Sequence, residues 1–249
     1  NTVNDITWNG TTFVAVGNNA AVATSSNGST WTYRSGLNTV WGAVAASCIT
    51  WNGTYFVVGG ATGHIARSTD GITWTDYTSN LTGTGWGSTQ AVQSIIWTSN
   101  SFVVAGQGKV AVSADGQTWT YKSSLLTVWT DTSATSHLLW NGSQVFVYGG
   151  SGVNGPSLAY STDTANYNSW SSATSSLTGT SWGSSNVPFA CVWTGSLYVL
   201  GGQNSAIATS PTGTSSWTYR SGLSSTTFVS IGSGSVTCLS KNNSIILAT

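Results

Sequence analysis

The chain has 249 residues, which suits one large all-β domain or two small ones. Its six basic and six acidic side chains cancel, and charged residues make up only 5% of the composition. The sequence therefore has neither the basic stripe that nucleic acid requires nor a polybasic segment for an anionic membrane surface. It also has no apolar stretch long enough to span a bilayer and no signal-peptide pattern. Because the chain begins at Asn1 and contains no Met, we expect a mature product or a segment of a longer polypeptide.

The 14 tryptophans fall into three columns of a repeat. The first column is Trp8, Trp51, Trp97, Trp140 and Trp193; the second is Trp31, Trp74, Trp119, Trp170 and Trp217; the third is Trp41, Trp86, Trp129 and Trp182, continued by Phe228. The first column recurs at spacings of 43, 46, 43 and 53 residues, a period typical of propellers and solenoids. We expect one β-propeller domain over residues 1–249, with repeats at about 1–40, 41–85, 86–128, 129–181 and 182–227 and a partial repeat at 228–249.

The second repeat shows the expected elements in chain order. Strands are predicted over residues 45–51, 55–58, 64–67 and 73–77, so each repeat is a four-stranded antiparallel blade. Asn52-Gly53 between the first two strands favours a two-residue type I′ turn. Two positions align across the repeats: Phe13, Phe56, Phe102, Phe146 and Tyr198 in the second strand, and Ala23, Ala66, Ala111, Ala159 and Ala208 in the third.

A linker of the form Leu-Thr-x-x-Trp-Gly follows the fourth strand and carries the third column of aromatic residues. These side chains have two possible roles, packing between blades or stacking on a ligand from the surface. The candidate ligand-binding residues are Trp41, Trp86, Trp129, Trp182 and Phe228. Packing is the favoured interpretation, since Trp is mostly buried in folded domains.

The last residues predict two strands of a sixth unit, at 235–241 and 244–249. Three arrangements remain open: a sixth blade left as a half blade, a sixth blade completed by another chain or by further residues, or a five-bladed ring with an extension. We prefer six blade positions with the last incomplete. Exposed strand edges recruit partners, so self-association through this unit is expected.

The turns before the second Trp column carry a recurring Ser-x-Asp-Gly-x-Thr-Trp sequence. Two repeats have it complete: Ser68, Asp70, Gly71 and Trp74, and Ser113, Asp115, Gly116 and Trp119; Asp163 keeps the acidic position in a repeat with an insertion. This run resembles the Asp-box of BNR-like, sialidase-related propellers, although Gly follows Asp one residue early. The resemblance implies a structural hairpin device and no catalytic role for these residues.

The wider unit, Trp-Asn-Gly-x-x-Phe-Val followed by that turn, resembles repeats of phage tail and fibre proteins and of bacterial surface proteins. The resemblance covers almost the whole chain. It implies a propeller located outside the cell, on a cell surface or on a virion, and many functions share that architecture.

Glycoside hydrolysis is the enzyme activity to test first, because sialidase-like propellers catalyse it. The reaction needs two carboxylates, or a Tyr with a carboxylate, at one bond. The chain has no Glu, and outside the Ser-x-Asp-Gly turns only Asp5, Asp76 and Asp131 remain. Arg34 and Arg220 occupy the same repeat position, so they are not expected to converge on one substrate. We therefore expect no enzyme and no catalytic residue.

Two non-catalytic functions remain. The first is a structural or adhesive module, favoured by the phage-like repeats and by the uncharged Ser/Thr/Gly surface. The second is a lectin-like propeller that binds cell-surface glycans at several repeated sites, which needs aromatic rings and hydroxyl groups but no charge. Neither requires a cofactor. Cys48, Cys191 and Cys238 are expected to be small buried residues, and no metal site is expected because His64 and His137 lie at different repeat positions.

Overall fold

The computed structural model describes residues 2–129, 135–151, 154–220, 235–236, 239–242 and 245–248. Their contacts divide the chain into two compact units, Asn1–Ser123 and Ser124–Thr249. The division falls between the third and fourth repeats. We describe each unit by itself and number the four-stranded sheets as blades in chain order.

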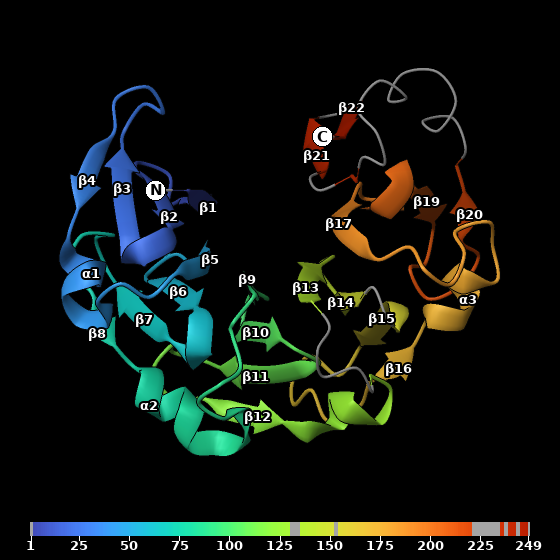
Figure 1. Cartoon of the computed structure of the whole chain (residues 1–249), viewed down its shortest axis with the longest axis horizontal. Coiled ribbons are helices and arrows are strands. Elements are labelled where there is room, and N and C mark those ends of the chain that lie inside the picture. The colour runs from blue at the N-terminus through green and yellow to red at the C-terminus, as the bar shows by residue number, and fades with distance from the viewer. Residues whose placement is uncertain are drawn as a thin grey trace. The chain divides into compact units, whose positions relative to one another are not determined.

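The N-terminal unit contains three four-stranded antiparallel sheets, coloured blue to green in Figure 1. Blade 1 is β1 (Val3–Trp8), β2 (Phe13–Gly17), β3 (Ala21–Ser25) and β4 (Thr32–Arg34). Blade 2 is β5 (Ala46–Trp51), β6 (Phe56–Gly60), β7 (Ile65–Ser68) and β8 (Thr75–Asp76). Blade 3 is β9 (Ser94–Trp97), β10 (Phe102–Gly106), β11 (Lys109–Ser113) and β12 (Thr120–Lys122). Each strand pairs with the next in sequence, as the repeat predicts.

The C-terminal unit contains two further four-stranded sheets and one two-stranded sheet. Blade 4 is β13 (Thr135–Trp140), β14 (Val145–Ser151), β15 (Gly155–Ser161) and β16 (Ser171–Ser172). Blade 5 is β17 (Pro188–Trp193), β18 (Tyr198–Gly202), β19 (Ile207–Ser210) and β20 (Thr218–Tyr219). The strands β21 (Leu239–Asn242) and β22 (Ile245–Ala248) pair antiparallel. The expected series of five complete blades and a half blade is confirmed.

Short helices occupy the linkers, where the sequence predicted only a connection. They are α1 (Gly36–Trp41), α2 (Thr78–Leu81), the π-helix η3 (Thr82–Trp86), the 3-10 helix η4 (Ser123–Thr127) and α3 (Thr174–Thr178). Three more 3-10 turns, η1 (Asn18–Ala20), η2 (Ala61–Gly63) and η5 (Gln203–Ser205), join second and third strands. Segments this short give no periodic pattern, and packing stabilises them instead. Each of the four linkers that the structure describes has one completely buried leucine: Leu37, Leu81, Leu125 and Leu177.

The prediction of two-residue type I′ turns is wrong. Trp51 pairs with Phe56, and the bond from Asn52 N–H to Tyr55 O encloses Gly53 and Thr54, so Asn52-Gly53 does not occupy the two central positions. The Asn52 carboxamide oxygen accepts the N–H groups of Thr54 and Tyr55 at 2.9 and 2.7 Å. Only Gly53 has positive φ, at 99°, whereas a type I′ turn requires positive φ at both central residues. Asn is favoured here because its side chain satisfies backbone donors.

The alignment of Phe146 with the other second-strand aromatics is also wrong. Trp140 pairs with Val145 in blade 4, whereas Trp8 pairs with Phe13 in blade 1. Val145 therefore takes the Phe position, and Phe146 lies on the opposite side of its strand, since successive side chains alternate. The aligned alanines of the third strands are confirmed by the register, for example Ala15 opposite Ala23 and Val147 opposite Ala159.

Each blade has two apolar faces, and the core lies between neighbouring blades. We call the side of a blade that meets the preceding blade its A face and the other side its B face. The B face of blade 1 (Val14, Val16 and Val22) and the A face of blade 2 (Ile49, Phe56, Val58, Ala66 and Trp74) form one buried cluster. Equivalent clusters lie between blades 2 and 3 and between blades 4 and 5. Stability thus depends on stacking of neighbours, as in other repeat proteins.

Ser99 generates a test of the first-turn geometry. It has φ of 75° where the other repeats have Gly, for example Gly53 at 99°. We expect Ser99→Gly to raise the free energy of unfolding by about 0.5 kcal/mol, because only the side chain opposes this backbone conformation. The matched change Gly53→Ser, whose Cβ would meet nothing within 4 Å, should lower it. Urea denaturation measures both, and the same sign for the two variants would contradict the account.

Candidate functional site

The third-column tryptophans are buried, which contradicts their assignment as a ligand-binding platform. The exposed fractions are 6% for Trp41, 0% for Trp86, 1% for Trp129 and 0% for Trp182. An indole ring with so little accessible surface cannot stack on a sugar. Phe228 lies outside the described residues. The alternative, packing between blades, agrees with the burial.

Hydrogen bonds fix these rings in place. Trp41 Nε1–H donates to Asp76 Oδ1 of blade 2 at 3.0 Å, and the Trp41 ring meets His64 edge-on at 5.3 Å. Trp86 Nε1–H donates to Gln90 O at 3.0 Å, and Trp182 Nε1–H donates to Asn186 O at 2.7 Å. A buried indole is stable when its N–H has such a partner. Trp41, Trp86 and Trp182 therefore anchor their linkers in the inter-blade clusters.

The Ser-x-Asp-Gly turns are satisfied internally, as a structural role requires. In blade 2 Asp70 Oδ1 accepts the N–H groups of Ile72 and Thr73, both at 2.8 Å, and Gly71 N–H donates to Ser68 Oγ at 2.9 Å. A Cβ on Gly71, whose φ is 71°, would lie 2.7 Å from Val14 of blade 1. Ser113, Asp115 and Gly116 repeat these bonds, with Gly116 against Val57 of blade 2, and Trp74 and Trp119 are each 4% exposed.

The carboxylates of these turns are stabilised by their bonds. Partial burial opposes ionisation of Asp70, but the N–H groups of Thr73 and Ile72 and the Ser68 hydroxyl hold its pKa below the ordinary value. The pKa of Asp115 is lowered in the same way, with Arg67 contributing. Asp163 keeps the role across its longer loop, accepting the N–H groups of Asn166 and Asn168 at 3.0 and 2.9 Å. The three carboxylates therefore stabilise the turns in which they lie.

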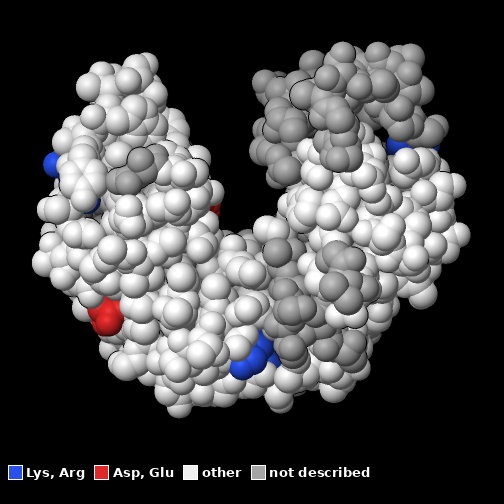
Figure 2. All heavy atoms as spheres, in the orientation of Figure 1, with Lys and Arg blue, Asp and Glu red and all other residues white. Residues whose placement is uncertain are grey.

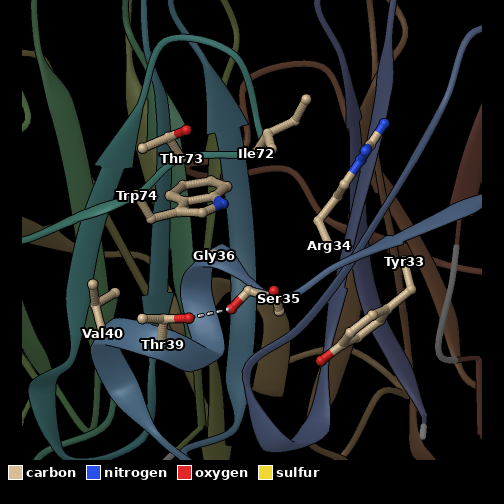
Figure 3. A pocket seen from close by; sticks show the side chains of 9 residues that line it. All are labelled: Tyr33, Arg34, Ser35, Gly36, Thr39, Val40, Ile72, Thr73 and Trp74. Carbon is tan, nitrogen blue, oxygen red and sulfur yellow. Dashed lines mark hydrogen bonds between the residues drawn. The ribbon is translucent and has the colours of Figure 1, made fainter.

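An open groove lies between blades 1 and 2, and sequence analysis did not find it. One lobe, of about 450 Å³, lies against α1 and the blade 2 turn (Figure 3). It is lined by Tyr33, Arg34, Ser35, Gly36, Thr39, Val40, Ile72, Thr73 and Trp74. A second lobe of about 310 Å³ is lined by Thr12, Thr24, Ser25, Ser26, Thr30, Thr32, Arg34, Asp70 and Ile72. Arg34 and Ile72 line both lobes, which join them into one feature of a size suited to small ligands.

The corresponding space between blades 2 and 3 is filled by Arg67. Its guanidinium lies 4.1 Å above the Tyr55 ring and 5.2 Å from that of Tyr77, and Nη1 donates to Asp115 O at 2.8 Å. Blade 1 has Thr12, Thr24 and Arg34 at the positions of Tyr55, Arg67 and Tyr77. Two aromatic rings and the long central side chain are thus absent, and the groove stays open. These three substitutions relative to blade 2 can be read from the sequence, but they form no motif that would identify a groove.

The groove presents hydrogen-bond donors without partners. Arg34 Nε–H donates to Thr24 Oγ1 at 2.9 Å, which fixes the plane of the guanidinium. Within the described residues this is its one polar contact, so both Nη groups are free. Trp74 Nε1 also has no acceptor, but this atom is buried, and Trp119 Nε1 and Trp217 Nε1 are unpaired in the same way, so the unpaired N–H recurs in the second Trp column. The donors that the groove offers to a ligand are therefore the Arg34 Nη groups.

The remaining acidic residues and the cysteines occupy other sites. Asp5 accepts Ile49 N–H at 2.8 Å across blades 1 and 2, and burial raises its pKa despite that bond and another from Ile6. Asp131 and Cys238 lie outside the described residues. Cys48 is buried, Cys191 is half-buried, and both are free thiols. Among the described residues, no three His, Cys, Asp or Glu side chains are grouped to hold a metal ion.

The surface agrees with the low charge of the sequence. Figure 2 shows few and scattered charged groups on the face it displays. None of the helices described is long and apolar enough to cross a membrane.

Comparison with known proteins shows similarity in fold. No protein-family model matches the chain, and no curated protein matches it. The designed protein Ika8 has a TM-score of 0.65 at 11% identity, covering 99% of this chain and 67% of its own. The structure of YCF48 bound to D1 peptide has a TM-score of 0.61 at 16% identity, covering 90% and 68%. The extracellular domain of BT4673 from B. thetaiotaomicron has a TM-score of 0.67 at 10% sequence identity, and the match covers 99% of this chain and 30% of that one. At such identities the likeness shows fold alone: the chain is an all-β protein of the β-propeller class.

Truncation of a third-column Trp tests its packing role. We expect Trp86→Ala to cost about 3–5 kcal/mol of unfolding free energy, because it empties a fully buried site, and Trp86→Phe to cost less. Trp8→Ala is the matched control, since Trp8 is 42% exposed. Urea denaturation gives these values. Equal small losses of unfolding free energy for Trp86→Ala and Trp8→Ala would contradict the packing role of Trp86.

The acid sensitivity of the turns provides a second test. Because the pKa of Asp70 is lowered on folding, its contribution to stability is present above the ordinary Asp pKa and is lost as pH falls through the lowered value. We expect Asp70→Asn to keep the turn at neutral pH, since Asn27 makes the same bonds to Ser29 and Thr30, and to flatten the decline in stability below about pH 4. Asn27→Asp should steepen it. Thermal unfolding between pH 2 and 7 measures both, and an unchanged acid profile in both variants would contradict the assignment.

Proposed function

We propose that this chain is a non-catalytic, extracellular or virion-surface propeller that acts as a structural or adhesive module and associates with copies of itself. The resemblance of its repeats to Asp-box propellers and to phage tail and bacterial surface proteins supports the location. The satisfied turn carboxylates support a structural use of the acidic residues. The exposed A face of blade 1 supports the association most directly.

The A face of blade 1 has the composition of a packing surface. Ile6, Ala15, Ala23 and Tyr33 form one row across its four strands. The equivalent row in blade 2, Ile49, Val58, Ala66 and Asp76, adjoins blade 1, and its first three residues are buried there. The exposed large apolar side chains of blade 1 are Val3 at 66%, Ile6 at 49%, Trp8 at 42%, Trp31 at 39% and Tyr33 at 60%.

The second Trp column shows the difference between this face and its equivalents. Trp31 is 39% exposed, whereas Trp74, Trp119 and Trp217 are 4–5% exposed. A contiguous apolar surface of this kind marks an interaction site in a soluble protein. The chain itself provides the complementary surface, because every A face in blades 2, 3 and 5 packs on the B face of a neighbour. A second copy is therefore the expected occupant.

The half blade provides a second candidate interface. Among the described residues its sheet has two strands, β21 and β22, and no third strand pairs with β22. An unpaired edge accepts a further strand through its backbone N–H and C=O groups. Self-association through both features would repeat the adhesive surface many times along an assembly.

Sedimentation velocity over a range of concentrations tests the proposal. We expect species larger than the 25.7 kDa chain, and we expect Ile6→Lys to reduce them because it places a charge in the A-face row. Leu197→Lys is the control, since Leu197 is an exposed apolar side chain, at 38%, that lies on blade 5 and outside the A-face row. A monomer at every concentration would contradict self-association, and so would equal assembly of both variants.

A further inference from the structure

We propose that the groove between blades 1 and 2 binds a carboxylate-bearing sugar unit, such as a uronic acid residue of a polysaccharide. The inference goes beyond the proposed function and does not require self-association. It replaces the third-column tryptophans with a different site, built by residues that break the repeat.

The lobe in Figure 3 is the carboxylate subsite. Arg34 is its one charged lining residue, and its free Nη groups form the planar fork that binds carboxylates. Ser35 and the Trp74 indole line the same lobe. A guanidinium with free Nη groups selects a ligand that offers negative acceptor oxygens.

The second lobe is the hydroxyl subsite. Its lining is rich in Ser and Thr and contains the Asp70 carboxylate. The N–H groups of Ile72 and Thr73 and the Ser68 hydroxyl bond to Asp70 Oδ1, and the Thr73 side chain also bonds to the carboxylate. The carboxylate has further lone pairs that can accept from a sugar hydroxyl. Asp70 is ionised at neutral pH because its pKa is lowered. A simple anion would not use this lobe, whereas a sugar acid offers hydroxyl groups to it and a carboxylate to Arg34.

The position of Arg34 between the lobes sets the orientation of the ligand. Thr24 holds Nε, so the guanidinium is fixed before the ligand arrives and little conformational entropy is lost on binding. Ile72 lines both lobes and gives the ring an apolar contact. The carboxylate and the hydroxyl groups of one sugar ring would thus lie on opposite sides of Arg34.

Titration with three small probes, followed in ¹H–¹⁵N spectra, tests this assignment. D-glucuronate carries both groups, D-glucose only the hydroxyls and acetate only the carboxylate. We expect the Trp74 indole N–H signal, identified with Trp74→Phe, to shift with glucuronate at an affinity about tenfold or more above either other probe, a difference of about 1.4 kcal/mol. Equal affinity for acetate would reduce the groove to a simple anion site, equal affinity for glucose would remove the role of Arg34, and no shift would overturn the proposal.

Matched variants locate the binding. Arg34→Gln should abolish the preference for glucuronate. Arg220→Gln should leave the preference unchanged, because Arg220 does not line either lobe. It is a matched control, since it occupies the same repeat position and makes the same Nε bond, to Thr209 Oγ1 at 2.9 Å. The triple change Thr12→Tyr, Thr24→Arg and Arg34→Tyr copies the filled groove of blades 2 and 3 and should also abolish binding. Retained preference in Arg34→Gln, or its loss in Arg220→Gln, would overturn the proposal whether or not the chain self-associates.

Discussion

The packing of one blade's A face on the B face of its neighbour is the interaction on which the rest of the structure depends. No blade is buried by itself, so each apolar row needs a neighbouring row, as between Ile49 and Val14 in the first inter-blade cluster. The buried tryptophans of the third column and the buried linker leucines stabilise that contact from the linker side. The Ser-x-Asp-Gly turns stabilise the same contact at the edge of the blade, where Gly71 packs closely against Val14.

Regularity and function are therefore separated in this chain. Residues that recur in every repeat, such as the Trp columns, hold blades together. The groove appears where blade 1 departs from the pattern, with Thr24 and Arg34 in place of the Arg67 and Tyr77 of blade 2. The exposed A face is also a feature of blade 1, whose Ile6 and Tyr33 are 49% and 60% exposed. Both features involve the first blade.

The sequence predicted the fold well because a 43–53 residue period of aromatic residues and Gly turns reports on blade geometry directly. It did not predict the short linker helices, which form through burial of residues such as Leu37. It misassigned the turn type because Asn-Gly fits two geometries, and it misplaced Phe146 because a one-residue shift changes the face. The groove was not predicted, since it depends on the space that Thr12, Thr24 and Arg34 leave unfilled between blades 1 and 2.

The central claim is that the recurring tryptophans of the third column serve blade packing while blade 1 presents an open surface. Hydrogen exchange of the indole N–H groups tests this most directly. The account predicts strong protection for Trp86 and Trp182, which are fully buried and bonded to Gln90 and Asn186, and rapid exchange for Trp8, which is 42% exposed. Rapid exchange of Trp86 and Trp182 in the folded protein would contradict it.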